Sequence, residues 1–152
     1  MLRTAFIKLS ESKSIRHFAE NSALGLRFSG RFVAGTQLAD AVRATEQVNQ
    51  WGASVTIDNL GENVTNAEEA KQSAELYHRM LDEIAMRKLN ANISLKLTHM
   101  GFDVSQELAF SLVTDLIAHA VQNNGFVRVD MEGSPYTQRT LDFVREMHRL
   151  PG

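Results

Sequence analysis

The chain has 152 residues, of which 43% are hydrophobic and 22% are charged, a balance typical of one globular unit and not of a disordered or fibrous chain. Its 16 basic and 18 acidic residues give a formal net charge of −2, which argues against a nucleic-acid binder. Cysteine is absent, which excludes disulfides, thiolate nucleophiles and cysteine metal sites. No apolar run approaches the roughly 20 residues of a membrane-spanning helix, so we expect no transmembrane segment.

Residues 1–52 predict a helical lead-in. Ile15 and Phe18 fall at a spacing that allows a shared helical face, and a clearer helix follows from Thr36, which is placed to cap it, to Gly52, which is placed to end it. The apolar positions at helical spacing in that second segment are Leu38, Ala41, Val42, Thr45 and Val48.

Three short stretches then alternate apolar and polar residues, which predicts strands with one apolar and one polar face. They cover residues 54–58, 92–98 and 126–132. In the third stretch, Val127 and Val129 would face one layer while Arg128 and Asp130 face the other. The polar faces of the three strands therefore carry ionisable residues that need a functional or structural explanation.

A helical pattern follows each strand. Asn66 and Glu69 have the spacing of a capping box at the head of a helix that reaches about residue 89. Ser105 opens a second helix that ends at Asn123-Asn-Gly125, and Ser134 with Pro135 opens a third. The residues expected to face inward are Ala70, Leu76, Tyr77, Met80 and Ile84, then Leu108, Leu112, Val113, Leu116, Ile117 and Ala120, and last Leu141, Val144 and Met147.

Strands that alternate with helices indicate an α/β fold with a parallel sheet, because each parallel strand needs a crossover helix. Strands of a doubly wound sheet read as continuous apolar runs, whereas one face is polar here, which favours a (β/α)₈ TIM-type barrel whose polar face points inward. A closed barrel takes about 250 residues and eight strands. We therefore predict a partial barrel: residues 53–152 as its first three strand-helix units, after the helical lead-in.

Four motifs occur in order between residue 31 and the end of the chain. They are Arg31-Phe-Val-Ala-Gly35; Asp58-Asn-Leu-Gly-Glu62; Ile93-Ser-Leu-Lys-Leu-Thr98 with Met100-Gly-Phe-Asp103; and Val127-Arg-Val-Asp-Met-Glu132 followed by Tyr136-Thr137. Together they resemble the opening half of the flavin-dependent proline dehydrogenases. The resemblance implies a barrel that holds FAD at its mouth, oxidises L-proline to Δ1-pyrroline-5-carboxylate, and passes the electrons to a quinone.

The resemblance also implies roles for single residues. Lys96 matches the lysine that pairs with the substrate carboxylate, Asp130 matches the active-site aspartate of the third strand, and Met131 matches a position that contacts the flavin. Glu62 matches a glutamate that gates the pocket from the loop after the first strand, where Asp58 is the other candidate pocket residue. The family's substrate-binding arginines and most groups that hold the flavin belong to later strands.

The residues alone support the same site with less force. A zwitterionic amino acid needs a cation for its carboxylate, which Lys96 can provide. The alternatives are a structural ion pair between Lys96 and Asp130, and a loop-capping role for Asp58. A metal site built from His99 with nearby carboxylates is a weaker alternative, because no short ligand-spacing motif supports it.

Three hypotheses of function remain open at this point. The first is proline dehydrogenase catalytic sequence that acts when the rest of the barrel is present. The second is an open-barrel fragment that pairs with a complementary C-terminal half or with a second copy of itself, and the third is another barrel enzyme for a small anion. We expect a cytoplasmic location, with peripheral attachment at the inner face of the membrane as an alternative.

Overall fold

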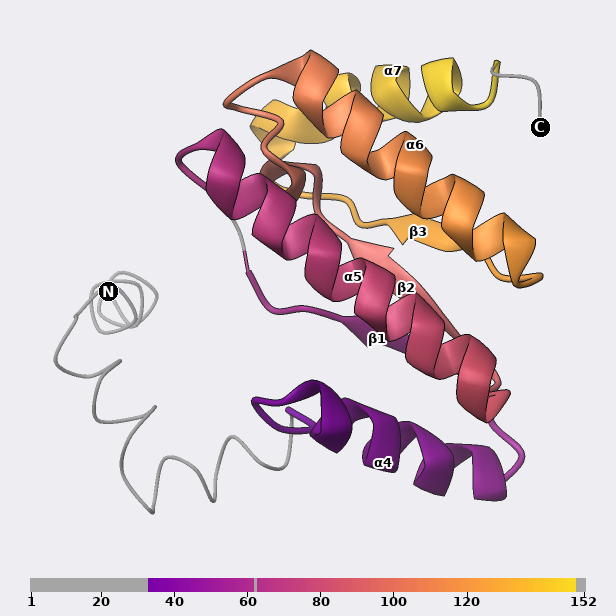
Figure 1. Ribbon diagram of the computed structural model, residues 1–152. Helices are drawn as coiled ribbons and strands as arrows, with labels where there is room; N and C mark the ends of the chain where they lie inside the picture. Colours follow the sequence, from indigo (N-terminus) through magenta and orange to yellow (C-terminus); the bar gives the residue numbers. More distant parts are fainter. Residues whose placement is uncertain (1–32, 62, 150–152) are drawn as a thin grey trace, which may run out of the picture. The chain divides into compact units, whose positions relative to one another are not determined.

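The computed structural model describes residues 33–61 and 63–149 (Figure 1). The helical face expected around Ile15 and the candidate gate residue Glu62 lie outside the described residues. The chain divides into two compact units, the first ending at Ala44 and the second beginning at Thr45. The predicted division into residues 1–52 and 53–152 stays a prediction.

Helix α4 (Leu38–Gln50) begins two residues after the predicted cap, Thr36. At its start, the backbone N–H of Gln37 donates a hydrogen bond of 3.1 Å to Oδ2 of Asp40. Its end agrees with the prediction, because Gly52 has φ of 81°, a left-handed conformation that glycine adopts without strain.

The strands form one parallel sheet in the order β1-β2-β3. They are β1 (Val55–Asp58), β2 (Ala91–Leu95) and β3 (Val127–Val129). Ile57 pairs with Ile93, and Ile93 pairs with Val127. Ile93 and Leu95 are fully buried, as expected for the apolar face of a central strand.

Strands β2 and β3 are shorter than the alternation predicted. After Leu95 the chain turns into the 3₁₀ helix η1 (Leu97–Met100), whose four residues are all buried. The backbone N–H of Asp130 still donates to the carbonyl of Leu95 at 2.9 Å, so the ladder between β2 and β3 closes one residue beyond β3. Lys96 and Asp130 therefore leave the sheet side by side.

Helix α5 (Ala67–Arg87) has the predicted cap. Oδ1 of Asn66 accepts a hydrogen bond from the backbone N–H of Glu69 at 3.0 Å, and Oε2 of Glu69 accepts one from the backbone N–H of Thr65 at 2.7 Å. The first bond satisfies a backbone donor that a helix start leaves without an intrahelical partner, and the second ties the residue before the cap to the first turn. The helix ends at Lys88, which has a left-handed φ of 53°.

Helix α6 (Gln106–Gln122) also has its predicted cap, since Oγ of Ser105 accepts from the backbone N–H of Leu108 at 3.1 Å. The 3₁₀ helix η2 (Ser134–Tyr136) then leads into α7 (Thr137–Met147). The predicted inward face of α7 is partly wrong, because Leu141 is exposed whereas Phe143 is buried.

Helices α5 and α6 pack against each other and cover the same face of the sheet, α5 over β2 and α6 against β3 (Figure 1). Their buried residues are Ala70, Ser73, Ala74, Tyr77, Met80 and Leu81 in α5, and Ala109, Val113, Leu116 and Ala120 in α6. Within the described part of the chain, no helix is both long enough and apolar enough to cross a membrane.

Candidate active site

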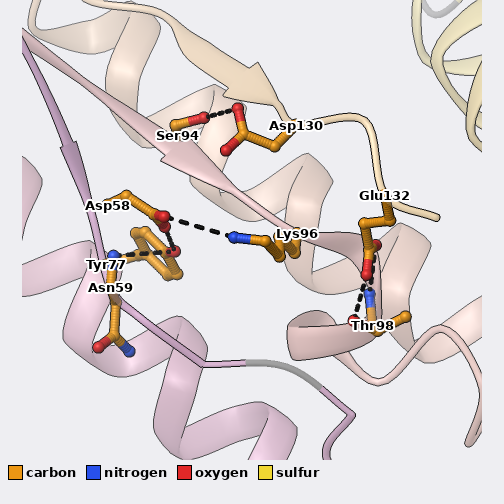
Figure 2. A network of polar contacts seen from close by, with 8 residues as sticks. All are labelled: Asp58, Asn59, Tyr77, Ser94, Lys96, Thr98, Asp130 and Glu132. Atoms are coloured by element: carbon orange, nitrogen blue, oxygen red, sulfur yellow. Dashed lines mark hydrogen bonds and ion pairs between the residues drawn. The ribbon is translucent and has the colours of Figure 1, made fainter. Parts of the chain in front are cut away.

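Three ionisable side chains lie at the carboxyl ends of the three strands (Figure 2). Asp58 is the last residue of β1, Lys96 follows β2 directly, and Asp130 follows β3 directly. Because the strands are parallel, these positions share one edge of the sheet, and in barrel enzymes that edge carries the active site.

Lys96 forms its salt bridge with Asp58. Its Nζ lies 3.5 Å from Oδ2 of Asp58, and the two side chains are only 19% and 25% exposed. The partner of Lys96 is thus the carboxylate of the preceding strand. The alternative from the sequence was an ion pair with Asp130. Partial burial strengthens the attraction relative to a fully solvated pair.

A tyrosine from helix α5 completes this pair. The hydroxyl of Tyr77 donates to Oδ1 of Asp58 at 3.1 Å and accepts from the backbone N–H of Asn59 at 3.3 Å. Burial raises the pKa of Tyr77, and the negative charge of Asp58 raises it further. Tyr77 therefore stays a neutral hydrogen-bond donor throughout the physiological pH range.

Asp130 is held by the central strand, since the hydroxyl of Ser94 donates to its Oδ1 (Figure 2). Ser94 is buried, and Lys96 lies two residues further along an extended backbone, with φ of −102° and ψ of 137°. Residues two apart on an extended chain share a face. Asp130 and Lys96 therefore lie on the same side of the sheet.

The loop beyond β3 is tied to η1 by Glu132. Oε1 of Glu132 accepts from the backbone N–H of Thr98 at 3.1 Å, and Oε2 accepts from the Thr98 hydroxyl at 2.5 Å (Figure 2). Two hydrogen bonds to one carboxylate restrain both segments. The strand pattern gave no signal for this contact, because it joins residues that are 34 positions apart.

The loop after β1 packs closely on η1. A Cβ atom at Gly61 would lie 2.4 Å from Cε1 of His99, so only glycine fits this position. The His99 ring is buried and meets the ring of Tyr77 edge to face, with centroids 6.4 Å apart. Among the described residues, no group of three or more His, Cys, Asp and Glu side chains is arranged to hold a metal ion.

Met131 is an exposed apolar residue next in sequence to this cluster. It follows Asp130 and is 54% exposed. An exposed apolar side chain next to a polar edge suits the face of a flavin ring, so the described residues are compatible with the implied FAD at this one position. The predicted roles of Met131, Lys96, Asp130 and Asp58 stay predictions.

A separate groove of about 460 Å³ lies between α6 and α7. Phe102, Phe110 and Phe143 line it, and Arg139 stacks over Phe102 with its guanidinium carbon 4.4 Å from the ring centroid. None of the strand-end residues lines this groove, so it is distinct from the candidate site.

The cluster suits a small zwitterion. A lysine offers several N–H donors to a carboxylate, and a carboxylate a short distance away can accept from an ammonium group. Lys96 contacts Asp58 directly, and Asp130 lies on the same face at the end of the next strand. One small molecule can therefore span the distance between the Lys96 ammonium and the Asp130 carboxylate.

Comparison with known proteins gives a consistent result. The model of the proline dehydrogenase family matches residues 41–151. Proline dehydrogenase 1 of Bacillus subtilis strain 168 is 38% identical over 147 residues, and proline dehydrogenase 2 of the same strain is 32% identical over 148. These alignments cover 96% and 97% of the chain but 48% of each relative, so the chain spans about half the length of the relatives it matches.

A solved structure shares the fold. The crystal structure of proline utilization A from Bdellovibrio bacteriovorus, inactivated by N-propargylglycine, superposes with a TM-score of 0.71 over 91% of this chain and 18% of that one, at 16% sequence identity. Together with the parallel sheet and its covering helices, this similarity confirms the predicted class, an α/β fold that forms part of a TIM-type barrel.

Proposed function

Since this chain belongs to the proline dehydrogenase family, we propose that it supplies the first three strand-helix units of a barrel that oxidises L-proline. The product would be Δ1-pyrroline-5-carboxylate, with FAD as the hydride acceptor and a quinone as the final electron acceptor. The observation that carries the proposal is the position of Lys96, a half-buried cation held by Asp58 at the strand edge where barrel active sites lie.

Lys96 binds the substrate carboxylate in this proposal. Its ammonium has three N–H donors, so it can keep Asp58 as a partner while it donates to a second carboxylate. The ion pair with Asp58 also holds the Lys96 ammonium at the strand edge, where a substrate carboxylate would meet it.

Asp130 acts on the substrate amine. Ser94 occupies its Oδ1, which orients Oδ2 for the nitrogen of a bound amino acid. Hydride loss from the carbon beside that nitrogen requires a neutral amine, so the site must accept or exclude a proton. A carboxylate held on the same face as Lys96 is placed to receive that proton or to hold the amine in position.

FAD, when bound, would accept the hydride at its N5 atom. Of the described residues, Met131 would hold the flavin through its exposed apolar side chain. Glu62, outside the described residues, would gate the pocket from the loop after β1. The groups that hold the flavin phosphates would come from later strands, as the family pattern implies.

The proposal extends to partners and location. In the described sheet β1 and β3 are the two edge strands, and each can pair with a further strand. We therefore expect a complementary barrel half, or further strands of the same polypeptide, to be required for turnover. We propose a cytoplasmic location, with peripheral attachment at the inner face of the membrane as the alternative that transfer of electrons to a quinone would favour.

Flavin absorbance and proline-dependent dye reduction test this proposal. We expect protein that carries this chain and the later barrel strands to purify with bound flavin and to reduce dye only when L-proline is added. The 152-residue chain alone should retain FAD weakly and show little turnover. Flavin-free protein that binds other small anions would instead support a different barrel enzyme.

A further inference from the structure

We propose that Tyr77 is a positioning residue that orders Lys96 for substrate binding by holding the Asp58 carboxylate between them. The inference rests on the proposed function and adds a residue from helix α5, outside the strand-end motifs. Tyr77 makes no contact with the substrate in this proposal. It acts through Asp58.

The geometry divides the two oxygens of Asp58 between two tasks. Oδ1 accepts from the Tyr77 hydroxyl at 3.1 Å, whereas Oδ2 faces Nζ of Lys96 at 3.5 Å. The Tyr77 hydroxyl is itself held by the backbone N–H of Asn59 at 3.3 Å. The carboxylate plane is therefore held from the helix side, and its free oxygen is directed at Lys96 (Figure 2).

The Tyr77 ring provides a rigid support for this contact. It is fully buried between α5 and the sheet, and it meets the buried ring of His99 edge to face. A buried hydroxyl usually requires a hydrogen-bond partner. Asp58 and Asn59 supply these partners, so the ring and its polar tip adopt one orientation.

Loss of the hydroxyl should loosen the pair without emptying the core. In Tyr77→Phe the ring still fills its site, but Oδ1 of Asp58 loses its donor and the carboxylate can rotate away from Lys96. Lys96 would then sample more orientations, and binding of a carboxylate would cost more conformational entropy. The effect should appear in KM for L-proline more than in kcat.

Tyr77→Phe and a matched control test the inference in protein that carries the complete barrel. We expect KM for L-proline to rise about three- to tenfold, with kcat changed less than about twofold, because Tyr77 acts only through Asp58 and its loss should cost less than the loss of a direct charged contact with the substrate. The control is Tyr136→Phe, which removes the hydroxyl of the chain's other tyrosine from Asp103, and it should leave KM unchanged. A KM rise in the control equal to that of Tyr77→Phe would overturn the inference.

A double-mutant cycle with Asp58→Asn separates positioning from general loss of structure. If Tyr77 acts through Asp58, Tyr77→Phe should have little further effect on KM in the Asp58→Asn background. The same rise in both backgrounds, or no rise in either, would overturn the inference.

Absence of proline turnover in the wild-type protein would refute the proposed function. An NMR measurement tests the positioning role of Tyr77 even in that case. In ¹³C-lysine-labelled protein, the Lys96 ε-methylene signal, assigned with Lys96→Met, should show two distinct hydrogen shifts in the wild type. These shifts should converge in Tyr77→Phe and stay distinct in Tyr136→Phe. Identical Lys96 signals in wild type and Tyr77→Phe would contradict the positioning role.

Discussion

Replacement of Lys96 by methionine removes the proposed partner of the substrate carboxylate. Methionine keeps most of the apolar stem but lacks the ammonium that lies 3.5 Å from Oδ2 of Asp58. A hydrogen bond to a charged group contributes about 1.5–3 kcal/mol, and each 1.4 kcal/mol corresponds to a factor of ten in affinity. We therefore expect KM for L-proline to rise about 10- to 100-fold.

The same change should have a small effect on stability. The Lys96 and Asp58 side chains are 19% and 25% exposed, and their charged atoms are 3.5 Å apart. A solvent-exposed pair contributes about 1 kcal/mol or less, and we expect this partly buried pair, with its long separation, to stay near that value. After the change, Asp58 keeps its hydrogen bond from Tyr77, so it is not left without a partner. Thermal denaturation should therefore separate the loss of binding from unfolding.

The assay is proline-dependent dye reduction by protein that carries this chain with the later barrel strands. Lys71→Met is the matched control, because Lys71 is an exposed residue of α5 and the substitution removes the same ammonium group there. The control should keep the wild-type KM. An unchanged KM in Lys96→Met would remove Lys96 from the substrate site and refute the reasoning.

Three further changes test the structure around the site. Gly61→Ala should lower the melting temperature, because its Cβ would lie 2.4 Å from the His99 ring. A second change, His99→Ala, should restore part of that loss. A Gly61→Ala protein with wild-type stability would contradict the close packing. Asn66→Ala should lower the free energy of unfolding by about 1 kcal/mol, measured by urea denaturation, whereas no loss would exclude the cap. Burial, and then the nearby His119, lower the pKa of His78 below its ordinary value of 6.5. The unfolded chain therefore binds more protons than the folded one, and stability should fall as the pH drops below 6.5. Melting curves of His78→Gln should show a smaller fall in stability, and an equal fall would assign the pH dependence to other groups.

The positions of the strand-end residues could be predicted because alternation has a period of two. Asp58, Lys96 and Asp130 each lie on a polar face near the carboxyl end of a strand, and parallel strands bring such ends together at one edge. The strand lengths were less accessible to prediction, because Leu97 continues the apolar alternation although it lies in η1. The local sequence pattern is the same whether β2 continues through Leu97 or ends before it. The turn into η1 depends on tertiary packing.

The contacts that order the site could not be predicted. Tyr77 fits the apolar face of α5, and only the fold brings its hydroxyl to Asp58, 19 residues earlier. Glu132 and Thr98 likewise meet only after β2 and β3 have paired. These contacts join elements that are separate in sequence, so a periodic pattern carries no signal for them.

Which face of α7 is buried could not be predicted from the sequence, for a different reason. Two stripes in α7 have helical spacing, one with Leu141 and Val144 and one with Thr140 and Phe143. The second stripe is buried because Phe143 packs edge to face with Phe102, with ring centroids 5.5 Å apart. Aromatic packing across two elements decided the orientation, and the helix sequence alone does not distinguish the two stripes.

A crystal structure with a non-oxidisable carboxylate analogue of proline, in protein that carries the complete barrel, tests the central claim most directly. We predict that the carboxylate of the analogue lies within hydrogen-bond distance of Nζ of Lys96, with its ring toward Asp130 and Met131. An analogue bound elsewhere, with the strand-end cluster unchanged, would contradict the claim that these three strand ends form the proline site.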